Sequence, residues 1–164
     1  MRPDNGAETI RRELPEEAAT LKLGAALAPL LEGGAVVHIQ GELGAGKTTL
    51  CRGILRALGV GGAVKSPTFT LVEPYDLGDR QIYHFDLYRL ADPSELEYIG
   101  IDDYFGERQV CLVEWPGKGE GFLPDCDLEV TLEVAGGGRS AIIQPRSDKG
   151  GRICRELAIT TQEP

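Results

Sequence analysis

The sequence lacks the long apolar runs and the N-terminal apolar segment that mark membrane and secreted proteins. No run of apolar residues approaches the ~18 needed to cross a bilayer. The N-terminal stretch MRPDNGAETIRRELPEE contains no apolar core of the kind found in secretory signals. We therefore expect no membrane association and a cytoplasmic location.

Cysteine and histidine are scarce and scattered, which argues against a metal or redox site built from close sequence spacing. The cysteines are Cys51, Cys111, Cys126 and Cys154. None forms a C-x-x-C pair, and neither His38 nor His84 stands at a zinc-ligand spacing from them. We expect idle or buried thiols, and histidines at core or hydrogen-bonded strand positions that make no ligand cluster.

Basic residues are outnumbered, so direct binding to nucleic acid is not favoured. The chain has 17 Lys and Arg against 26 Asp and Glu, a formal charge of −9, and a pI of about 4.7. Such a surface repels a phosphodiester backbone over most of its area, although one local basic patch stays open. If the protein serves a nucleic acid, we expect it to act through a partner.

Length and composition indicate a globular chain of one domain. With 164 residues, 41% of them apolar and 6% aromatic, the chain can bury a single core. There is no internal repeat, and low-complexity sequence is limited to short glycine-rich turns. We expect one domain over residues 1–164, with residues 1–13 and 150–164 as loose tails or, at the C-terminal end, a short helix.

The first half of the chain reads as helix, strand, glycine loop, helix. Residues 14–34 predict a helix with Pro15 at its first position. Residues 35–40, AVVHIQ, have the short apolar run of a buried parallel strand. After the loop, apolar residues recur every four positions in residues 48–59, which predicts an amphipathic helix ending at Gly59.

The second half alternates strands with turns. Residues 70–90 are strand-like on both sides of the sequence DLGD, which indicates a hairpin. Asp92 and Pro93 predict the N-cap and first turn of a short helix. Residues 109–115 predict a buried strand that ends in an acid, and residues 127–145 predict two strands around a glycine turn.

The glycine loop matches the complete phosphate-binding pattern G-x-x-x-x-G-K-[ST]. Glycines let the backbone wrap a phosphate with its N–H groups, and the following helix presents its positive end. Lys47 can reach the β and γ phosphates, and the Thr48 hydroxyl can hold Mg²⁺. The alternative is a simple glycine turn with no phosphate site. The predicted strand before the loop and the predicted helix after it favour the phosphate site. The predicted nucleotide contacts of the loop are Gly41, Glu42, Leu43, Gly44, Ala45, Gly46, Lys47, Thr48 and Thr49.

A triphosphate site also needs an acid near the metal, and two predicted strands end in one. These acids are Asp86 in HFD and Glu114 in CLVE, and Glu114 has the cleaner context because its strand is apolar throughout. Either could instead be a solvated residue at a strand end. Residues 65–70, KSPTFT, offer hydroxyls that could meet Mg²⁺ or the γ phosphate, or they form a simple turn. Trp115 follows Glu114 directly and is either a site residue or a packing residue.

Several classes of P-loop protein are excluded or disfavoured by missing motifs. The guanine-binding N-K-x-D loop is impossible because Asn5 is the only asparagine, and the ABC signature L-S-G-G-Q is absent. The chain is short for AAA or RecA-type modules. No arginine-rich lid of the kind that small-molecule kinases use is evident, although several arginines are available. These are Arg52, Arg56, Arg80 and Arg89.

Five motifs in a fixed order carry a resemblance to a known family. GELGAGKTTL, VKSPTFTLVEPY, HFDLYRL, ELEYIGIDDYF and CLVEWPGKG closely resemble the bacterial TsaE (YjeE) family, the ATPase of tRNA threonylcarbamoyladenosine biosynthesis. The resemblance covers residues 14–147 and gives no function to the terminal dozen residues at either end. It implies an α/β, P-loop NTPase-like fold, in which a mixed sheet has parallel core strands extended by antiparallel hairpins and helices on both faces.

The resemblance also implies a role and partners. The family binds ATP and Mg²⁺ and joins TsaB and the carbamoyl-transferring TsaD, which modify the adenosine beside the anticodon. ATP hydrolysis is thought to reset that complex, and tRNA is contacted only indirectly. An acidic surface fits this arrangement because the partners hold the tRNA.

Residue roles carried over from the family concern the loop and the two strand ends. Thr48 and Glu114 resemble the Mg²⁺ contacts, and residues 43–48 resemble the triphosphate cradle. Asp86 resembles the residue needed for hydrolysis, through water or metal, and Trp115 resembles a functional neighbour of Glu114. Residues 17–20 resemble the segment that approaches the adenine.

The leading hypothesis is therefore an ATPase subunit with Lys47, Asp86 and Glu114 as catalytic residues and Trp115 beside the nucleotide. We expect slow turnover by the chain alone, since no arginine finger is evident, and stimulation by partners. Two alternatives stay open. One is a binding module that is gated by nucleotide and needs no hydrolysis, and the other is a small-molecule kinase.

Overall fold

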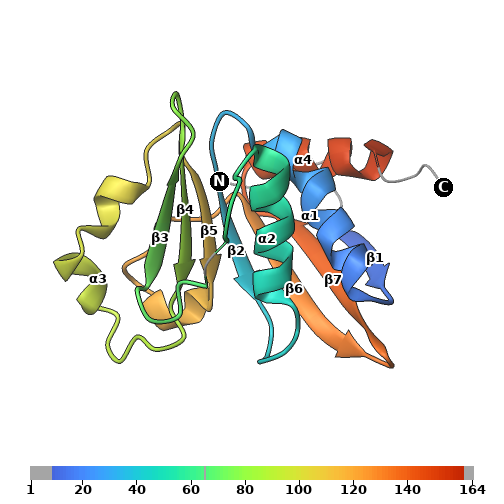
Figure 1. Ribbon diagram of the computed structural model, residues 1–164, viewed down its shortest axis with the longest axis horizontal. Helices are drawn as coiled ribbons and strands as arrows, with labels where there is room; N and C mark the ends of the chain where they lie inside the picture. The colour runs from blue at the N-terminus through green and yellow to red at the C-terminus, as the bar shows by residue number, and fades with distance from the viewer. Residues whose placement is uncertain (1–8, 65, 161–164) are drawn as a thin grey trace.

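A seven-stranded mixed sheet organises the chain (Figure 1). The computed structural model describes residues 9–64 and 66–160. In chain order the elements are β1 (Ile10–Leu14), α1 (Glu17–Leu31), β2 (Ala35–Gln40), α2 (Lys47–Leu58), β3 (Val72–Asp76), β4 (Gln81–Asp86), α3 (Glu95–Tyr98), η1 (Ile101–Tyr104), β5 (Val110–Glu114), η2 (Pro116–Gly119), β6 (Leu128–Ala135), β7 (Gly138–Pro145) and α4 (Asp148–Thr160).

The sheet has a parallel centre and antiparallel edges. Its strand order is β1-β7-β6-β2-β5-β4-β3. β2 pairs in parallel with β5 and β6, and β5 pairs in parallel with β4. The β3–β4 and β6–β7 hairpins and the β1–β7 pair are antiparallel. The predicted parallel core with antiparallel extensions is confirmed, and the carboxyl ends of β2, β4 and β5 therefore meet at one edge of the sheet.

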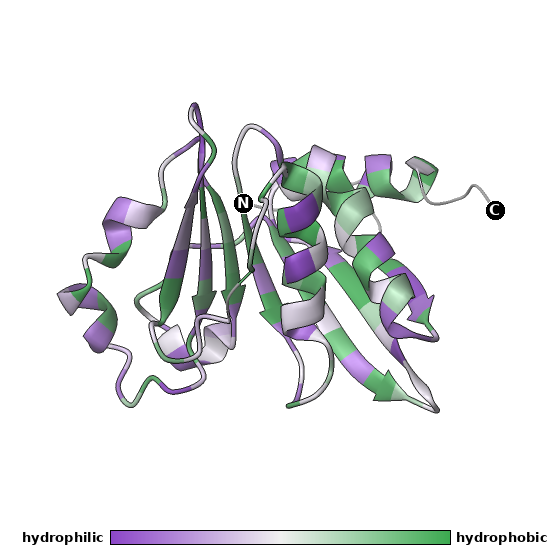
Figure 2. Ribbon diagram, in the orientation of Figure 1, coloured by the Kyte–Doolittle hydropathy of each residue, from purple (hydrophilic) through white to green (hydrophobic). Residues whose placement is uncertain are grey.

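One face of the sheet carries the larger core under α1, α2 and α4 (Figure 1). Hydrophobic and hydrophilic residues alternate along β6 and β7 (Figure 2), so each strand buries one side. The helices α1 and α2 approach each other closely at two glycines. A Cβ on Gly24 would lie 2.8 Å from the Leu50 oxygen, and one on Gly53 would lie 2.7 Å from the Leu21 oxygen. This contact fixes α2, and with it the phosphate-binding loop, against α1.

The other face carries a smaller core made by short helices. Phe85, Leu87, Leu96 and Val113 bury their side chains there. The segments that cover them are α3, η1 and η2, each of four residues. Helices on both faces are confirmed, although the second layer consists of single turns. Among the described residues, no helix is both long and apolar enough to span a bilayer.

The chain ends differ from the sequence-based expectation of loose tails. Ile10 and Leu14 lie on one side of β1 and are buried, and β1 pairs with β7. Residues 148–160 form α4, which buries Ile153 and Leu157, so the helical alternative was right for that part. Residues 1–8 and 161–164 lie outside the described residues.

Two predicted helix starts were too early. α1 begins at Glu17 because Glu16 is extended, with φ −152° and ψ 169°, so Pro15 lies before the helix. α3 begins at Glu95. The carboxylate of Asp92 accepts a hydrogen bond from the Ser94 N–H at 2.9 Å, which makes a local turn before the helix instead of an N-cap.

Candidate functional site

The phosphate-binding loop connects the end of β2 to the start of α2. Its glycines have φ values of 151° at Gly41, 81° at Gly44 and 102° at Gly46. Residues with a side chain rarely adopt such positive φ values. Gly41 has a second constraint, since a Cβ there would lie 2.6 Å from the Leu132 oxygen on β6. The sequence therefore forms this loop because glycine stands where the backbone must turn and where β6 passes closely.

The Lys47 side chain is buried against the loop although it carries a charge. Its side chain is 5% exposed, and Nζ donates hydrogen bonds to the carbonyl oxygens of Gly41 at 2.6 Å and Glu42 at 2.9 Å. Nζ also lies 4.3 Å from the centroid of the Trp115 ring, a cation–π contact. Burial lowers the pKa of Lys47, while the negative charges of Glu114 and Asp86 oppose that shift.

The two predicted acids lie side by side at the carboxyl ends of neighbouring parallel strands. Asp86 on β4 and Glu114 on β5 are direct register partners, and they are 5% and 2% exposed. The Thr48 hydroxyl, in the first turn of α2, donates to Glu114 Oε1 at 3.1 Å. The structure thus brings the neighbours Lys47 and Thr48 together with Asp86 and Glu114, which lie on two later strands.

Asp86 is oriented by the loop that precedes β3. Its Oδ2 accepts a hydrogen bond from the Thr68 hydroxyl at 3.2 Å, and its Oδ1 accepts one from the Tyr88 N–H at 3.0 Å. Ser66 and Thr68 share a further hydrogen bond of 2.7 Å. The hydroxyl-bearing loop proposed from the sequence therefore touches the candidate site through Asp86. Lys65, its first residue, lies outside the described residues.

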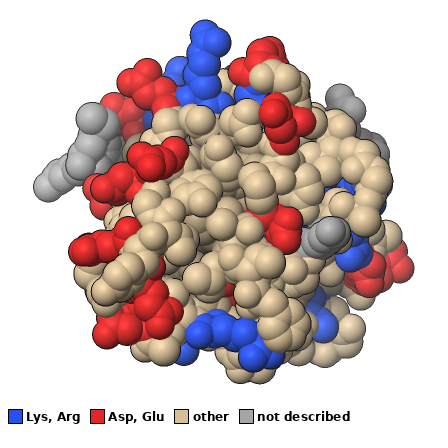
Figure 3. All heavy atoms as spheres, turned by 60° about the vertical axis from the view of Figure 1, so that its left-hand side comes forward, with Lys and Arg blue, Asp and Glu red and all other residues tan. Residues whose placement is uncertain are grey.

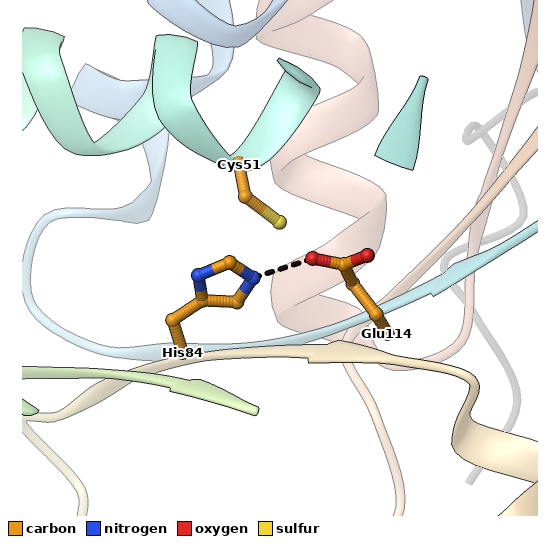
Figure 4. Close-up of side chains that lie close together, drawn as sticks. All are labelled: Cys51, His84 and Glu114. Atoms are coloured by element: carbon orange, nitrogen blue, oxygen red, sulfur yellow. Dashed lines mark hydrogen bonds and ion pairs between the residues drawn. The ribbon is translucent and has the colours of Figure 1, made fainter. Parts of the chain in front are cut away.

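His84 is part of the site, and sequence reasoning missed it. Its Nε2 lies 2.6 Å from Glu114 Oε2, and the imidazole is fully buried. The hydrogen-bonded strand position was predicted correctly. The prediction that the histidines make no ligand cluster is wrong for His84, because Cys51, His84 and Glu114 lie together (Figure 4). The available signal was spacing: His84 stands two residues before Asp86, and alternate strand residues share a face.

Lys47, Thr48, Asp86 and Glu114 all line one open cleft of about 410 Å³. Its lining comprises Leu43, Gly44, Gly46, Lys47, Thr48, Thr49, Thr68, Asp86, Tyr88, Arg89, Glu114 and Trp115. Three residues expected at the nucleotide, Gly41, Glu42 and Ala45, shape the loop without lining the cleft. On the face that carries α3 and β3, Figure 3 shows acidic groups and separate basic groups rather than a continuous basic patch of described residues.

The segment expected to approach the adenine lies behind the loop. Thr20 packs near it, since a Cβ on Gly46 would be 3.9 Å from Thr20 Cγ2. Glu17 forms an ion pair of 2.9 Å with Arg52 on α2. Neither Glu17 nor Thr20 lines the cleft. Their predicted role stays a prediction.

Arg139 is a further contact that the sequence did not indicate. This residue of β7 donates to the Gly44 carbonyl oxygen through Nε at 3.1 Å and through Nη2 at 2.9 Å. The two residues are 95 positions apart. Only the pairing of β7 with β6 and β1 brings Arg139 to the phosphate-binding loop, so no local motif could reveal it.

Comparisons with known proteins agree on one family. A family model described as threonylcarbamoyl adenosine biosynthesis protein TsaE matches residues 14–141. A similar protein from Haemophilus influenzae, named tRNA threonylcarbamoyladenosine biosynthesis protein TsaE, is 44% identical over 151 residues, which cover 89% of this chain and 96% of that protein. A protein of the same name from Bacillus subtilis is 40% identical over 146 residues, or 88% and 89% of the two chains.

The fold has a solved counterpart as well. The crystal structure of Bacillus subtilis YdiB matches with a TM-score of 0.81 and 28% sequence identity. The match covers 96% of this chain and 99% of that one. Together with the strand order, this similarity confirms the predicted P-loop NTPase-like fold.

Proposed function

Because the chain belongs to the TsaE family of threonylcarbamoyl adenosine biosynthesis proteins, we propose that it is an Mg²⁺-dependent ATPase serving that modification of tRNA. The observation that carries the proposal is the convergence of Lys47, Thr48, Asp86 and Glu114 on one cleft. Triphosphate cleavage needs a positive side chain and a helix N-terminus at the phosphates, here Lys47 and the start of α2. It also needs carboxylates near the metal and the attacking water, here Glu114 and Asp86.

The donor atoms at the loop fit Mg²⁺. The Thr48 hydroxyl and the Glu114 carboxylate, 3.1 Å apart, supply the oxygen ligands that this ion prefers. When bound, Mg²⁺ would offset negative charge on the phosphate oxygens. Thr48 and Glu114 would hold the ion, and His84 Nε2, 2.6 Å from Glu114 Oε2, fixes the direction of the carboxylate.

Lys47 and the loop backbone bind the triphosphate in this proposal. Lys47, at the start of α2, reaches back to the carbonyl oxygens of Gly41 and Glu42 at the other end of the loop, so its amino group already lies beside the cradle that would take a phosphate. The side chain is 5% exposed, and low local solvation strengthens its attraction for phosphate charge.

Asp86 orients water at the cleft. The Thr68 hydroxyl and the Tyr88 N–H, neither of which belongs to the phosphate-binding loop, each donate a hydrogen bond to one Asp86 oxygen. These two bonds keep the carboxylate in one orientation where it lines the cleft. This places an acceptor beside Glu114 without requiring Asp86 to bind the triphosphate.

Turnover by the chain alone is slow in this proposal, and TsaB and TsaD raise it. Arg89 lines the cleft, but its guanidinium lies 4.5 Å from the centroid of the exposed Phe69 ring, a contact that holds it. A partner that rearranges this pair would free a cation for the transferred phosphoryl group. Hydrolysis then resets the complex, and tRNA is contacted by the partners, in keeping with the charge of −9.

The test is phosphate release from Mg-ATP by the full chain, first alone and then with purified TsaB and TsaD. Lys47→Ala and Glu114→Ala are expected to lower release by roughly 10²–10³-fold, since each removes a group that stabilises transition-state charge. Lys22→Ala and Glu97→Ala, at exposed helix positions, are the matched controls and should leave release unchanged.

ATP binding is measured on the same samples, which separates the rival functions. If ATP binds but no phosphate is released with both partners present, and partner function survives in Glu114→Ala, the chain is a nucleotide-gated binding module. If labelled γ phosphate appears on a metabolite instead of in solution, the chain is a kinase. Either result would refute the ATPase proposal.

A further inference from the structure

Three side chains with different donor atoms meet beneath the phosphate-binding loop. Cys51 comes from α2, His84 from β4 and Glu114 from β5. One ligand atom from each, sulfur, imidazole nitrogen and carboxylate oxygen, lies within 4.8 Å of the other two. The exposed fractions are 0% for Cys51 and His84 and 2% for Glu114. Figure 4 shows the Cys51 thiol pointing down from α2 toward the gap between imidazole and carboxylate.

We infer that Cys51, His84 and Glu114 form a binding site for a thiophilic divalent cation of the Zn²⁺ class. Zinc takes cysteine sulfur, histidine nitrogen and carboxylate oxygen, and sites with three protein ligands keep a fourth position for water. Mg²⁺ prefers oxygen ligands and gains nothing from a thiol or an imidazole. The donor set therefore selects a different ion from the one that Thr48 and Glu114 fit.

The three ligands stand on rigid parts of the fold. β4 and β5 are adjacent parallel strands, and each is paired on both sides within the sheet. Cys51 lies in the second turn of a helix fixed by the Gly53 contact to α1. Burial and the charges of Glu114 and Asp86 raise the pKa of Cys51, so ionising the thiol offsets part of the free energy gained when the cation binds.

Proton bookkeeping for binding is simple. The cation forms bonds to Cys51 Sγ, His84 Nε2 and a Glu114 oxygen, and the thiol proton leaves to solvent. The neutral imidazole keeps its single proton, which must then reside on Nδ1. That nitrogen is buried and has no hydrogen-bond partner among the described residues, so a proton there leaves a buried donor unsatisfied, a cost that the bond from Nε2 to the cation must exceed.

Glu114 makes the site exclusive with the Mg²⁺ arrangement. The same carboxylate accepts the Thr48 hydrogen bond at 3.1 Å, and Cys51 follows Thr48 by one helical turn. His84 contacts Oε2 of this carboxylate and Thr48 contacts Oε1, so a cation held by Cys51 and His84 would draw on the same negative charge as Mg²⁺ at Thr48, and the two cations would repel each other across one carboxylate. The consequence is competition: a thiophilic cation inhibits Mg-ATP hydrolysis. This last step rests on the proposed function, whereas the binding site does not.

The direct test is a titration of the full chain with Co²⁺, a spectroscopic substitute for Zn²⁺, without nucleotide. Binding at Cys51 produces a thiolate-to-cobalt charge-transfer band, which Zn²⁺ then removes. Cys51→Ala should weaken this binding by at least ~100-fold, since even the loss of an outer partner of a metal ligand costs ~10–100-fold. Cys154→Ala is the matched control, because Cys154 is also a fully buried helical cysteine.

Thermal unfolding of each variant checks that folding is intact, and Cys51→Ser provides a second variant that lacks the Cys51 thiol, with a side chain of nearly equal size. The inference is overturned if the wild-type chain shows no thiolate band, or if the band persists in both Cys51 variants.

A parallel assay measures phosphate release with Mg-ATP and added Zn²⁺. Inhibition in the wild type and in Cys154→Ala, with at least ~10-fold less sensitivity in Cys51→Ala, supports competition. Equal inhibition in all three chains overturns it. A clear thiolate band with no ATP hydrolysis in any chain would support the cation site and refute the proposed function.

Discussion

The cleft end of the sheet and the flank made by β6, β7 and α4 bury different kinds of side chain. At the cleft end, the polar side chains of Lys47, His84, Asp86 and Glu114 are buried and make hydrogen bonds. Under α1 and α4 the flank buries apolar residues of β6 and β7. These are Leu128, Val130, Leu132, Ala141 and Ile143.

The difference shows which region stabilises the fold and which region contributes little to its stability. Buried apolar surface stabilises the fold at about 25 cal/mol per Å². Buried charged groups lose hydration, and their mutual attraction rarely exceeds that loss. The cleft end therefore contributes little to folding and keeps its polar groups for ligands. Substitutions in the two regions should separate stability from activity.

The largest effect is expected from Leu27→Ala in α1. Leu27 is fully buried in the larger core, and the truncation should lower the free energy of unfolding by about 2–5 kcal/mol. Denaturant unfolding measures this change, and phosphate release per folded molecule should stay near the wild-type value. Ile159→Ala, at a 72% exposed position of α4, is the control. A similar loss in both variants would contradict the assignment of the core.

The next effect should come from Glu114→Gln, which removes a charge and keeps the volume. Phosphate release with partners should fall by roughly 10²–10³-fold because the proposed Mg²⁺ site loses its carboxylate charge. The free energy of unfolding should fall by less than in Leu27→Ala, because glutamine leaves no cavity and its amide oxygen can still accept the hydrogen bond from the Thr48 hydroxyl. Unfolding and phosphate release are measured on one preparation. A destabilisation as large as that of Leu27→Ala would erase the contrast between the regions.

The smallest effect is expected from Arg139→Ala, which lies where the two regions meet. Loss of the two hydrogen bonds to Gly44 should weaken ATP binding by roughly 3–10-fold, as for one or two partly exposed charged hydrogen bonds. Calorimetric titration with ATP checks this, and Arg139→Lys should recover part of the affinity. Arg11→Ala, on the exposed side of β1, should bind ATP as the wild type does. Unchanged binding in Arg139→Ala would show that β7 does not support the loop.

Local sequence signals were enough for the parts of the site that lie within one motif. The loop around Lys47 was readable because glycine spacing and the next helix are consecutive in the chain. Asp86 and Glu114 could be predicted because each ends a predicted strand, and the strand before Glu114 is apolar throughout. Their adjacency followed only once β4 and β5 paired in parallel.

Contacts that depend on strand order or exact register were not readable. His84 and Glu114 are in contact because they lie on neighbouring strands. Arg139 contacts Gly44 although the two residues are 95 positions apart in the sequence. β1 was missed because Ile10 and Leu14, four residues apart, fit either a helix or one side of a strand. Pairing with β7 decides in favour of the strand.

The position of Trp115 gives the molecule an internal optical reporter. It is the single tryptophan of the chain, so all indole fluorescence originates at the cleft, where the Lys47 amino group lies 4.3 Å from the ring. A positive charge at that distance perturbs the excited state of the indole, and its displacement changes the emission. Any ligand that draws Lys47 away from the ring can therefore be followed in the unlabelled protein, in real time and without a coupled assay.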